Sequence, residues 1–282
     1  MEKARFSIIL ATKFASECLD LCLKSFFANK TLDIELIIIA DNPSWQVVKV
    51  LQDRKLKYHL VNNGHYWINL NYGITLTTND YVGYINDDVV LGPNWDIAIQ
   101  ELLGENNIVG MMNLQDHGGF RFSLDGKTTK VDNFDYNAFI KYCLDNSKNE
   151  PMMNYAMPGV FYKPKFLDTG GFTTHADHGY GHDCQVYSRM FYKYGAVCPK
   201  TFKSYLWHFG ASGNADQLDE SIYRGPYTHG HMKCMLCTSF VEGLEYTSKQ
   251  SWEVLDSGYY ICDSCKSKKD FSDPRVFYKE KK

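Results

Sequence analysis

In residues 80–95, "DYVGYINDDVVLGPNW", a predicted buried strand is followed directly by a group of polar side chains. A run of apolar and β-branched residues ends abruptly in Asn86, Asp87 and Asp88, and a second apolar run follows directly. A short, continuous apolar run is typical of a strand that is covered on both faces, as in a parallel sheet. The three polar residues are therefore expected at the carboxyl end of such a strand.

The same pattern repeats along the chain and indicates an α/β fold. Besides residues 81–86, apolar runs predict buried strands at residues 6–12, 34–41, 57–61 and 107–112. Helical spacing predicts four helices between these strands. The first has Ser16 as its N-cap and Phe27 on its buried side, and the others cover residues 44–54, residues 67–78 and the segment from Pro93 to Gly104. Strands that alternate with helices form right-handed crossovers and a mostly parallel, Rossmann-like sheet with flanking helices.

The second half of the chain has a weaker pattern. Residues 113–155 are rich in loop-forming residues, with a predicted hairpin near Asp125-Gly126 and a helix over "YNAFIKYCL". A helical stripe follows in "HDCQVYSRMFYKYG". We expect two domains, a large α/β domain over residues 1–225 and a small C-terminal module over residues 226–282.

The composition narrows the function classes. Of 282 residues, 44% are hydrophobic and 22% charged, as in an ordinary soluble globular protein. The net charge of −3 gives no overall electrostatic case for nucleic-acid binding. The aromatic share of 15% suits clefts that hold rings such as sugars or bases, although a Tyr-rich core would account for it equally well.

The sequence also predicts a location. No segment is typical of a signal peptide, and no apolar run reaches the 18 residues of a membrane span. Five scattered cysteines are expected to be buried, reduced thiols: Cys18, Cys22, Cys143, Cys184 and Cys198. Together these features favour a reducing, cytoplasmic setting.

Polar residues follow three of the predicted strands, at Thr12, at Asp41, and at Asn86 to Asp88. Because open parallel sheets bind ligands at the carboxyl ends of their strands, we expect these side chains to line a crevice. Carboxylate oxygens suit Mg²⁺ or Mn²⁺, which need few protein ligands when a substrate diphosphate supplies others. For a bare carboxylate pair, the alternative is an Asx-type turn that merely closes the strand.

Two later residues are further candidates. Asp183 begins the apolar stripe of its predicted helix, so it is either a partly desolvated general base or a charge that the helix dipole favours. His208, in "SYLWHFGASGN", is either a ligand or a satisfied core histidine. The sequence alone leaves both pairs of interpretations open.

The order of these elements resembles a family 2 glycosyltransferase of the GT-A fold, over residues 5–212. Four stretches carry the resemblance: "IIIADNPS", "NNGHYWINLNYGI", "INDDVV", and Gly170, Gly171 and Phe172 followed by "GYGHD". In "INDDVV", Asn86 takes the place of the first Asp of the family's metal motif. A downstream histidine of the family falls on His208.

The resemblance implies a nucleotide-sugar donor and assigns its contacts. Thr12 would lie beside the base or ribose, and Asp41 would accept a hydrogen bond from the base. Asn71 would also bind the donor, and Asp87 or Asn86 would contact the donor sugar or metal-bound water. The donor would be UDP-, GDP- or dTDP-linked and carry a hexose or deoxyhexose.

The resemblance also implies the chemistry. Asp88 and His208 would hold Mn²⁺ or Mg²⁺, and Asp183 would deprotonate the acceptor hydroxyl, so that one displacement inverts the anomeric centre. The resemblance does not name the acceptor; a macromolecular acceptor (DNA, protein or glycan) is a hypothesis that the basic C-terminal tail raises. Two positions depart from the family pattern: Leu70 replaces an Arg that contacts the diphosphate, and His182 replaces the Glu before the catalytic Asp.

The C-terminal module carries a second signal. Cys234 and Cys237 form one C-x2-C pair and Cys262 and Cys265 a second, separated by residues 238–261. Two such knuckles predict a structural Zn²⁺ site in a zinc ribbon; two disulfides or four free thiols are the alternatives. The basic tail that follows indicates either a contact with nucleic acid or protein, or a solvated segment that only packs on the larger domain.

Two other functions compete with the inverting, metal-dependent glycosyltransferase. A nucleotidyltransferase would also place carboxylates at strand ends, but "LATKFASE" lacks the Gly-rich, basic phosphate loop expected near its N-terminus. A non-catalytic zinc-ribbon binding protein on a degenerate transferase scaffold is the third hypothesis, because Asn86 and Leu70 depart from the family pattern.

Overall fold

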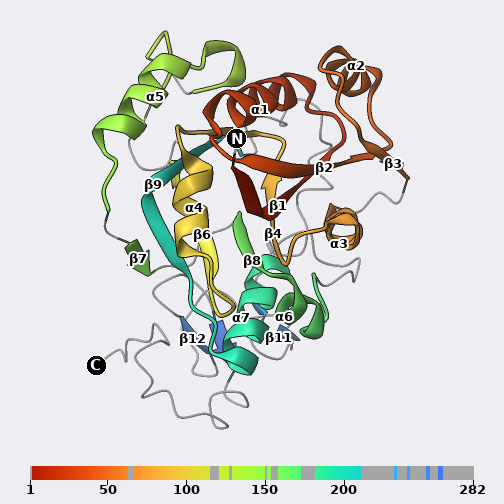
Figure 1. The fold of residues 1–282 in the computed structure, drawn as a ribbon, viewed down its shortest axis with the longest axis vertical. Coiled ribbons are helices and arrows are strands. Elements are labelled where there is room, and N and C mark those ends of the chain that lie inside the picture. The colour runs from red at the N-terminus through yellow and green to blue at the C-terminus, as the bar shows by residue number, and fades with distance from the viewer. Residues whose placement is uncertain are drawn as a thin grey trace.

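The structure is a computed structural model. It describes residues 2–62, 66–114, 121–126, 129–149, 151–153, 158–172 and 182–210, with four short strands beyond them. Nine of the described strands form one sheet that helices cover on both faces (Figure 1). They are β1 (Lys3–Thr12), β2 (Asp33–Asp41), β3 (His59–Val61), β4 (Tyr81–Asn86), β5 (Val89–Leu91), β6 (Ile108–Leu114), β7 (Pro151–Met153), β8 (Gly159–Tyr162) and β9 (Pro199–His208).

The sheet is mixed but mostly parallel, as predicted. Its order is β3-β2-β1-β4-β8-β6-β9-β5, and β7 also pairs with β9. The first four strands in this order run parallel, and so do β6 and β9. β8 is antiparallel to both neighbours, and β5 and β7 are antiparallel to β9. The carboxyl ends of β1, β2 and β4 therefore lie at one edge.

Two apolar layers hold the helices to the sheet. One layer packs α1 (Ser16–Asn29), α2 (Trp45–Asp53) and α4 (Trp95–Leu102) against one face. The other packs α3 (Tyr66–Leu76), α6 (Lys163–Asp168) and α7 (His182–Tyr194) against the opposite face. Gly73 lets α3 lie close to β1, because a Cβ there would come within 2.6 Å of Ile9 Cγ2.

A third apolar cluster extends the core beside β9. It joins α5 (Tyr136–Asp145) to β9, which lie on the same side of the molecule (Figure 1). The side chains of Phe139 and Trp207 in this cluster are fully buried. The 3-10 helix η1 (Val131–Asn133) precedes α5. Near the predicted hairpin, Ser123 and Phe134 form a single antiparallel bridge, and Gly126 adopts a left-handed φ of 68°.

Most predicted elements are present, with shifts at their ends. Ser16 was predicted as the N-cap of the first helix, but it is the first helical residue, and Ala15 takes the N-cap without a side-chain hydrogen bond. Phe27, predicted on the buried side, is 41% exposed. Ser44 does cap α2, since its side chain accepts a hydrogen bond from the Val47 N–H.

The predicted zinc ribbon falls mostly outside the described residues. Cys234, Cys237 and Cys265 lie outside them, as does the predicted domain boundary. Cys262 ends β13 (Tyr260–Cys262), which pairs antiparallel with β12 (Trp252–Val254), and β10 (Met232–Lys233) pairs with β11 (Phe240–Val241). The zinc site therefore stays a prediction.

The side chains of four of the five scattered cysteines are described, and all four are buried: Cys18, Cys22, Cys143 and Cys198. Within the described part of the chain, no helix combines the length and apolar character that crossing a bilayer would need.

Candidate active site

The polar strand ends meet because the parallel strands are in register. Ala11 of β1 lies opposite Asn86 of β4. The next residue of β1, Thr12, lies opposite Ala40 of β2, and Ala40 directly precedes Asp41. The structure thus brings three of the predicted groups, Thr12, Asp41 and the Asn-Asp-Asp turn, to one edge of the sheet. This is the edge where a parallel sheet receives its ligands.

Strand β5 brings His208 to the same edge. β5 runs antiparallel to β9 and places Val89 opposite His208, and the Phe209 N–H donates to the Asp88 carbonyl at 3.0 Å. As a result, Nε2 of His208 lies 3.1 Å from Oδ1 of Asp88. Asp88 is only 5% exposed, so this carboxylate has little contact with water.

Asp87 is the neighbouring carboxylate in the turn. Its Oδ2 accepts a hydrogen bond from the Thr12 hydroxyl at 2.7 Å, and the Lys13 backbone N–H donates to it as well. Burial, together with the charge of Asp88, raises the pKa of Asp87 to about 7, although these hydrogen bonds act in the opposite direction. A cation that binds at the turn would favour the ionised form.

Two amide side chains complete the edge. Asn86 Oδ1 accepts a hydrogen bond from the Tyr66 hydroxyl at 2.6 Å, and its Nδ2 lies 3.2 Å from His208 Nε2. Asn69 Nδ2 donates to Oδ2 of the buried Asp41 at 3.1 Å. Tyr66 and Asn69 come from the first turn of α3, so this helix supports the ends of both β2 and β4.

The Asp88–His208 pair fits a divalent cation. A carboxylate oxygen and an unprotonated imidazole nitrogen are both acceptors, and two acceptors 3.1 Å apart need a shared cation, either a proton or a metal ion. Among the residues that the structure describes, no group of three or more His, Cys, Asp or Glu residues is arranged so that it could hold a metal ion. Two ligands from the chain are sufficient for Mg²⁺ or Mn²⁺ when phosphate and water complete the shell.

Asp183 lies in the first turn of α7 and is half-buried. Its charge contributes, after burial and the charges of Asp87 and Asp88, to raising the pKa of Tyr66 well above its usual range. The charges of Asp87, Asp88 and Asp183 therefore each act on the Tyr66 hydroxyl. Asp183 remains the predicted base.

Comparison with known proteins identifies the family. Residues 7–193, more than half of the chain, match the family described as Glycosyl transferase family 2. The chain belongs to glycosyl transferase family 2. The matched segment includes all of the residues described above at the carboxyl ends of the strands, except His208. The protein is accordingly a glycosyltransferase, an enzyme that moves a sugar onto an acceptor.

This family 2 glycosyltransferase is also similar to a solved structure. The crystal structure of S. aureus TarS residues 1–349 resembles it with a TM-score of 0.49 and 12% sequence identity, covering 79% of this chain and 68% of the TarS chain. A search of curated proteins found no match.

The structure does not bring Asn71 to the strand edge through any described contact. Its Nδ2 donates to the Phe172 carbonyl at 2.8 Å, and its Oδ1 accepts from the Phe172 N–H at 3.0 Å. Arg189 of α7 donates to the neighbouring Gly171 carbonyl. Asn71 thus ties α3 to the segment before α7, and the predicted donor contact remains a hypothesis.

Leu70 has a structural role in this glycosyltransferase. Its side chain is fully buried in the layer between α3 and the sheet. The position predicted to correspond to a phosphate-binding Arg therefore faces the core and not the strand edge.

Two residues at this edge, Tyr66 and Asn69, were not predicted from the sequence. Both lie in the stretch "NNGHYWINLNYGI" that carried the family resemblance, but nothing in the local pattern distinguishes them from core or surface residues. Their roles depend on how the first turn of α3 meets the ends of β2 and β4, which is a tertiary property.

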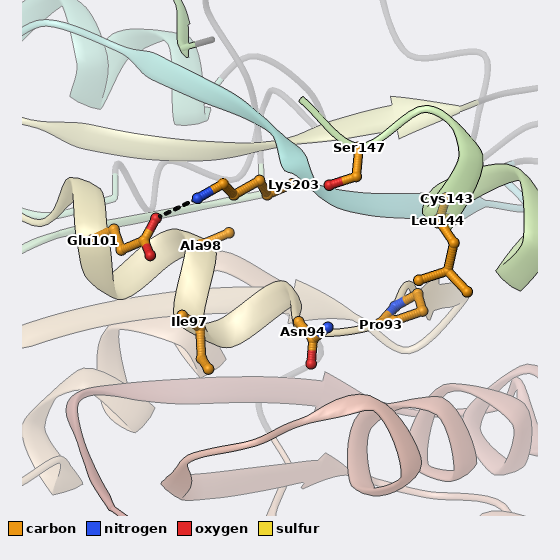
Figure 2. A pocket seen from close by; sticks show the side chains of 9 residues that line it. All are labelled: Pro93, Asn94, Ile97, Ala98, Glu101, Cys143, Leu144, Ser147 and Lys203. Carbon is orange, nitrogen blue, oxygen red and sulfur yellow. Dashed lines mark hydrogen bonds and ion pairs between the residues drawn. The ribbon is translucent and has the colours of Figure 1, made fainter. Parts of the chain in front are cut away.

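A separate cavity of about 130 Å³ lies between α4, α5 and β9 (Figure 2). Its lining consists of Pro93, Asn94, Ile97, Ala98, Glu101, Cys143, Leu144, Ser147 and Lys203. Glu101 and Lys203 form an ion pair at 3.1 Å, so their charges compensate each other. None of the predicted site residues lines this cavity, and we assign the chemistry to the strand edge.

Proposed function

We propose that this glycosyltransferase moves a sugar from a nucleoside diphosphate donor to an acceptor hydroxyl, with inversion and with Mn²⁺ or Mg²⁺ as cofactor. The observation that carries the proposal is the Asp88–His208 pair at the edge that also holds Thr12 and Asp41. Its chemistry fits a cation with two protein ligands, which leaves positions for a diphosphate.

The donor side follows from the edge residues. Thr12 and Asp41 end neighbouring strands, and Asn69 holds the Asp41 carboxylate in place. A buried carboxylate is a hydrogen-bond acceptor that suits the N–H of a nucleobase, which is the role proposed for Asp41. Asp88 and His208 would hold the cation, which when bound supplies positive charge to stabilise the departing diphosphate.

The acceptor side depends on Asp183. In the proposed reaction the acceptor oxygen forms a bond to the anomeric carbon, and the bond from that carbon to the diphosphate oxygen breaks. The electron pair leaves with the nucleoside diphosphate, and Asp183 takes the proton of the acceptor hydroxyl. Attack from the side opposite the leaving group inverts the anomeric centre.

Thermal shift measurements with UDP-, GDP- and dTDP-sugars, each with and without Mn²⁺, test the donor proposal. We expect one nucleotide to raise the melting temperature, and only when Mn²⁺ is present. Turnover of that donor, followed by NMR of the anomeric signal of the product, then tests inversion. Equal stabilisation with and without metal would contradict the metal proposal, and a retained anomer would contradict single displacement.

For the C-terminal module, we propose that Cys234, Cys237, Cys262 and Cys265 hold one structural Zn²⁺. The support is the spacing of two C-x2-C pairs, which is typical of zinc ribbons. Metal analysis of the purified protein should find about one zinc per chain. A Cys262→Ser variant should lose it, whereas Cys143→Ala, which changes a buried cysteine of the large domain, should keep it.

A further inference from the structure

Strand β1 lies between the two strands that hold the proposed ends of the donor. It separates β2, which ends at Asp41, from β4, which is followed by the turn with Asp88. β2 and β4 are two strand spacings apart, which is about 10 Å. A donor with its base at Asp41 and its diphosphate at Asp88 must therefore cross the end of β1, where Thr12 and Lys13 lie.

Lys13 is fixed at this crossing point by its backbone. Its N–H donates a hydrogen bond to the carboxylate of Asp87, in the turn after β4. Its carbonyl accepts a hydrogen bond from the Ser44 N–H, in the segment after β2, at 3.0 Å. The backbone of Lys13 is thus tied to the segments that follow both neighbouring strands, so its side chain begins in the middle of the proposed donor path.

The side chain of Lys13 can exchange its present contact for a ligand. Its Nζ lies 4.9 Å from the centroid of the Phe14 ring, which is 39% exposed. None of the ion pairs among the described residues involves Lys13. A cation–π contact at such a ring is weaker than a charge-assisted hydrogen bond to phosphate, so a bound diphosphate would draw the ammonium away from Phe14.

The strand edge also needs positive charge to hold a diphosphate. Asp88 would compensate part of the charge of a cation bound beside it, and Asp87 adds a second carboxyl group. Leu70, at the position that corresponds to a phosphate-binding Arg, is fully buried and has no charge to offer. Of the residues named above at the strand ends, Lys13 is the one with a lysine or arginine side chain.

We propose that Lys13 is a donor-binding residue: its ammonium pairs with a phosphate oxygen of the nucleoside diphosphate and supplies the positive charge that Leu70 does not. This inference deepens the proposed function and rests on it, because it takes Asp41 as the base contact and Asp88 as a cation ligand. Since lysine binds phosphate as a point charge on a flexible stem, arginine should replace it, whereas an uncharged side chain should not.

Calorimetric titration with UDP, GDP and dTDP, in the presence of Mn²⁺, identifies the nucleoside diphosphate that the wild-type protein binds. We expect Lys13→Gln to weaken its binding by about tenfold, because a hydrogen bond to a charged group is lost. Lys13→Arg should stay within about threefold of wild type. Raising KCl from about 10 mM to about 1 M should reduce the difference between Lys13→Gln and wild type, because salt screens an exposed ion pair.

Lys24→Gln is the matched control. Lys24 also lies over an aromatic ring, 5.5 Å from the centroid of Tyr136, but it belongs to the middle of α1. The substitution removes the same charge and should leave diphosphate affinity within about twofold of wild type. A folded Lys13→Gln protein that binds the diphosphate as tightly as wild type would overturn the inference. An equal loss in Lys24→Gln would also overturn it, since net charge and not a local contact would then be the cause.

These measurements separate the inference from the proposed function. If wild type binds the diphosphate equally well with and without Mn²⁺ and Lys13→Gln loses affinity, the metal proposal is contradicted and the role of Lys13 is supported. Metal-dependent binding that Lys13→Gln leaves unchanged would overturn the role of Lys13 while the proposed function stands. A wild-type protein that binds none of the three diphosphates would overturn both.

Discussion

The Thr12 hydroxyl donates a hydrogen bond to Asp87 Oδ2 at 2.7 Å, joining the end of β1 to the turn after β4. This contact holds one carboxylate of the Asn-Asp-Asp turn toward β1. The other carboxylate, Asp88, turns toward His208 on β9. The adjacent residues Asp87 and Asp88 thus contact different neighbours, and of the two only Asp88 is paired with a second candidate metal ligand.

Replacing Asp87 by Asn should change how stability depends on pH. Because the pKa of Asp87 rises from 3.8 to about 7 on folding, the folded protein holds this proton where the unfolded chain has lost it. The free energy of unfolding should therefore fall as pH rises from about 4 to 7, by at most roughly 4 kcal/mol. Metal-free Asp87→Asn should lack this loss and be more stable than wild type at pH 8.

Urea denaturation at pH 5 and pH 8 in the presence of EDTA measures the difference. The difference in the free energy of unfolding between Asp87→Asn and wild type should be larger at pH 8 than at pH 5. Asp53→Asn is the control. It changes an exposed carboxylate whose side chain is 62% accessible, so the free energy of unfolding should match wild type at both pH values. An equal gap at the two pH values would show that Asp87 does not titrate in this range.

Asp183→Asn should retain donor binding and lose transfer. General base catalysis contributes about 10²–10⁴ in rate, so kcat should fall by at least about 100-fold. Its KM for the donor should stay within about threefold, because Asp183 is proposed to face the acceptor. Asp168→Asn changes a carboxylate on the surface that pairs with Lys193 and should keep wild-type turnover. Near-normal turnover by Asp183→Asn would remove Asp183 as the base.

His208→Gln should weaken metal-dependent binding of the donor. The substitution keeps a polar side chain but removes the imidazole nitrogen that lies beside Asp88. We expect the stabilisation by nucleotide sugar and Mn²⁺ to fall, while stability without ligand changes little. His59→Gln alters an exposed histidine on β3 and serves as control. Undiminished metal-dependent stabilisation in His208→Gln would exclude His208 as a ligand.

Asp96→Ala should destabilise the fold without touching the strand edge. Asp96 is fully buried, and its Oδ2 accepts backbone hydrogen bonds from Thr31 and Leu32 at 2.6 Å each. Removing a buried acceptor leaves both N–H groups unpaired, which costs roughly 2–5 kcal/mol. Urea denaturation should show this loss, and Asp145→Ala, at an exposed i,i+4 pair, should cost under about 0.5 kcal/mol.

A stability loss for Asp96→Ala as small as that of the control would mean that water replaces the lost acceptor. At temperatures where the variant is folded, its donor KM should match wild type, because the described contacts of Asp96 lie in the segment between α1 and β2 and not at the strand edge.

Local sequence patterns were sufficient to predict these strands and helices in the first half of the chain. Continuous apolar runs predicted β1, β2 and β4, because strands buried on both faces need apolar residues at nearly every position. Helical spacing predicted α1, α2 and α4 for the equivalent reason, since one stripe of each helix must face the sheet. The polar residues that interrupt these runs marked the strand edge.

Contacts between distant segments could not be predicted in this way. β8 and β9 were not predicted as strands, since their sheet partners, including β4 and β6, lie far from them in the chain. Asn71 was predicted as a donor contact, and that stays a prediction; its hydrogen bonds with the Phe172 backbone could not be predicted from the local pattern. The link from Tyr66 through Asn86 to His208 joins three elements that no local pattern relates. Periodicity shows which side chains are buried, whereas the pairing of β5 with β9 decides which polar groups meet.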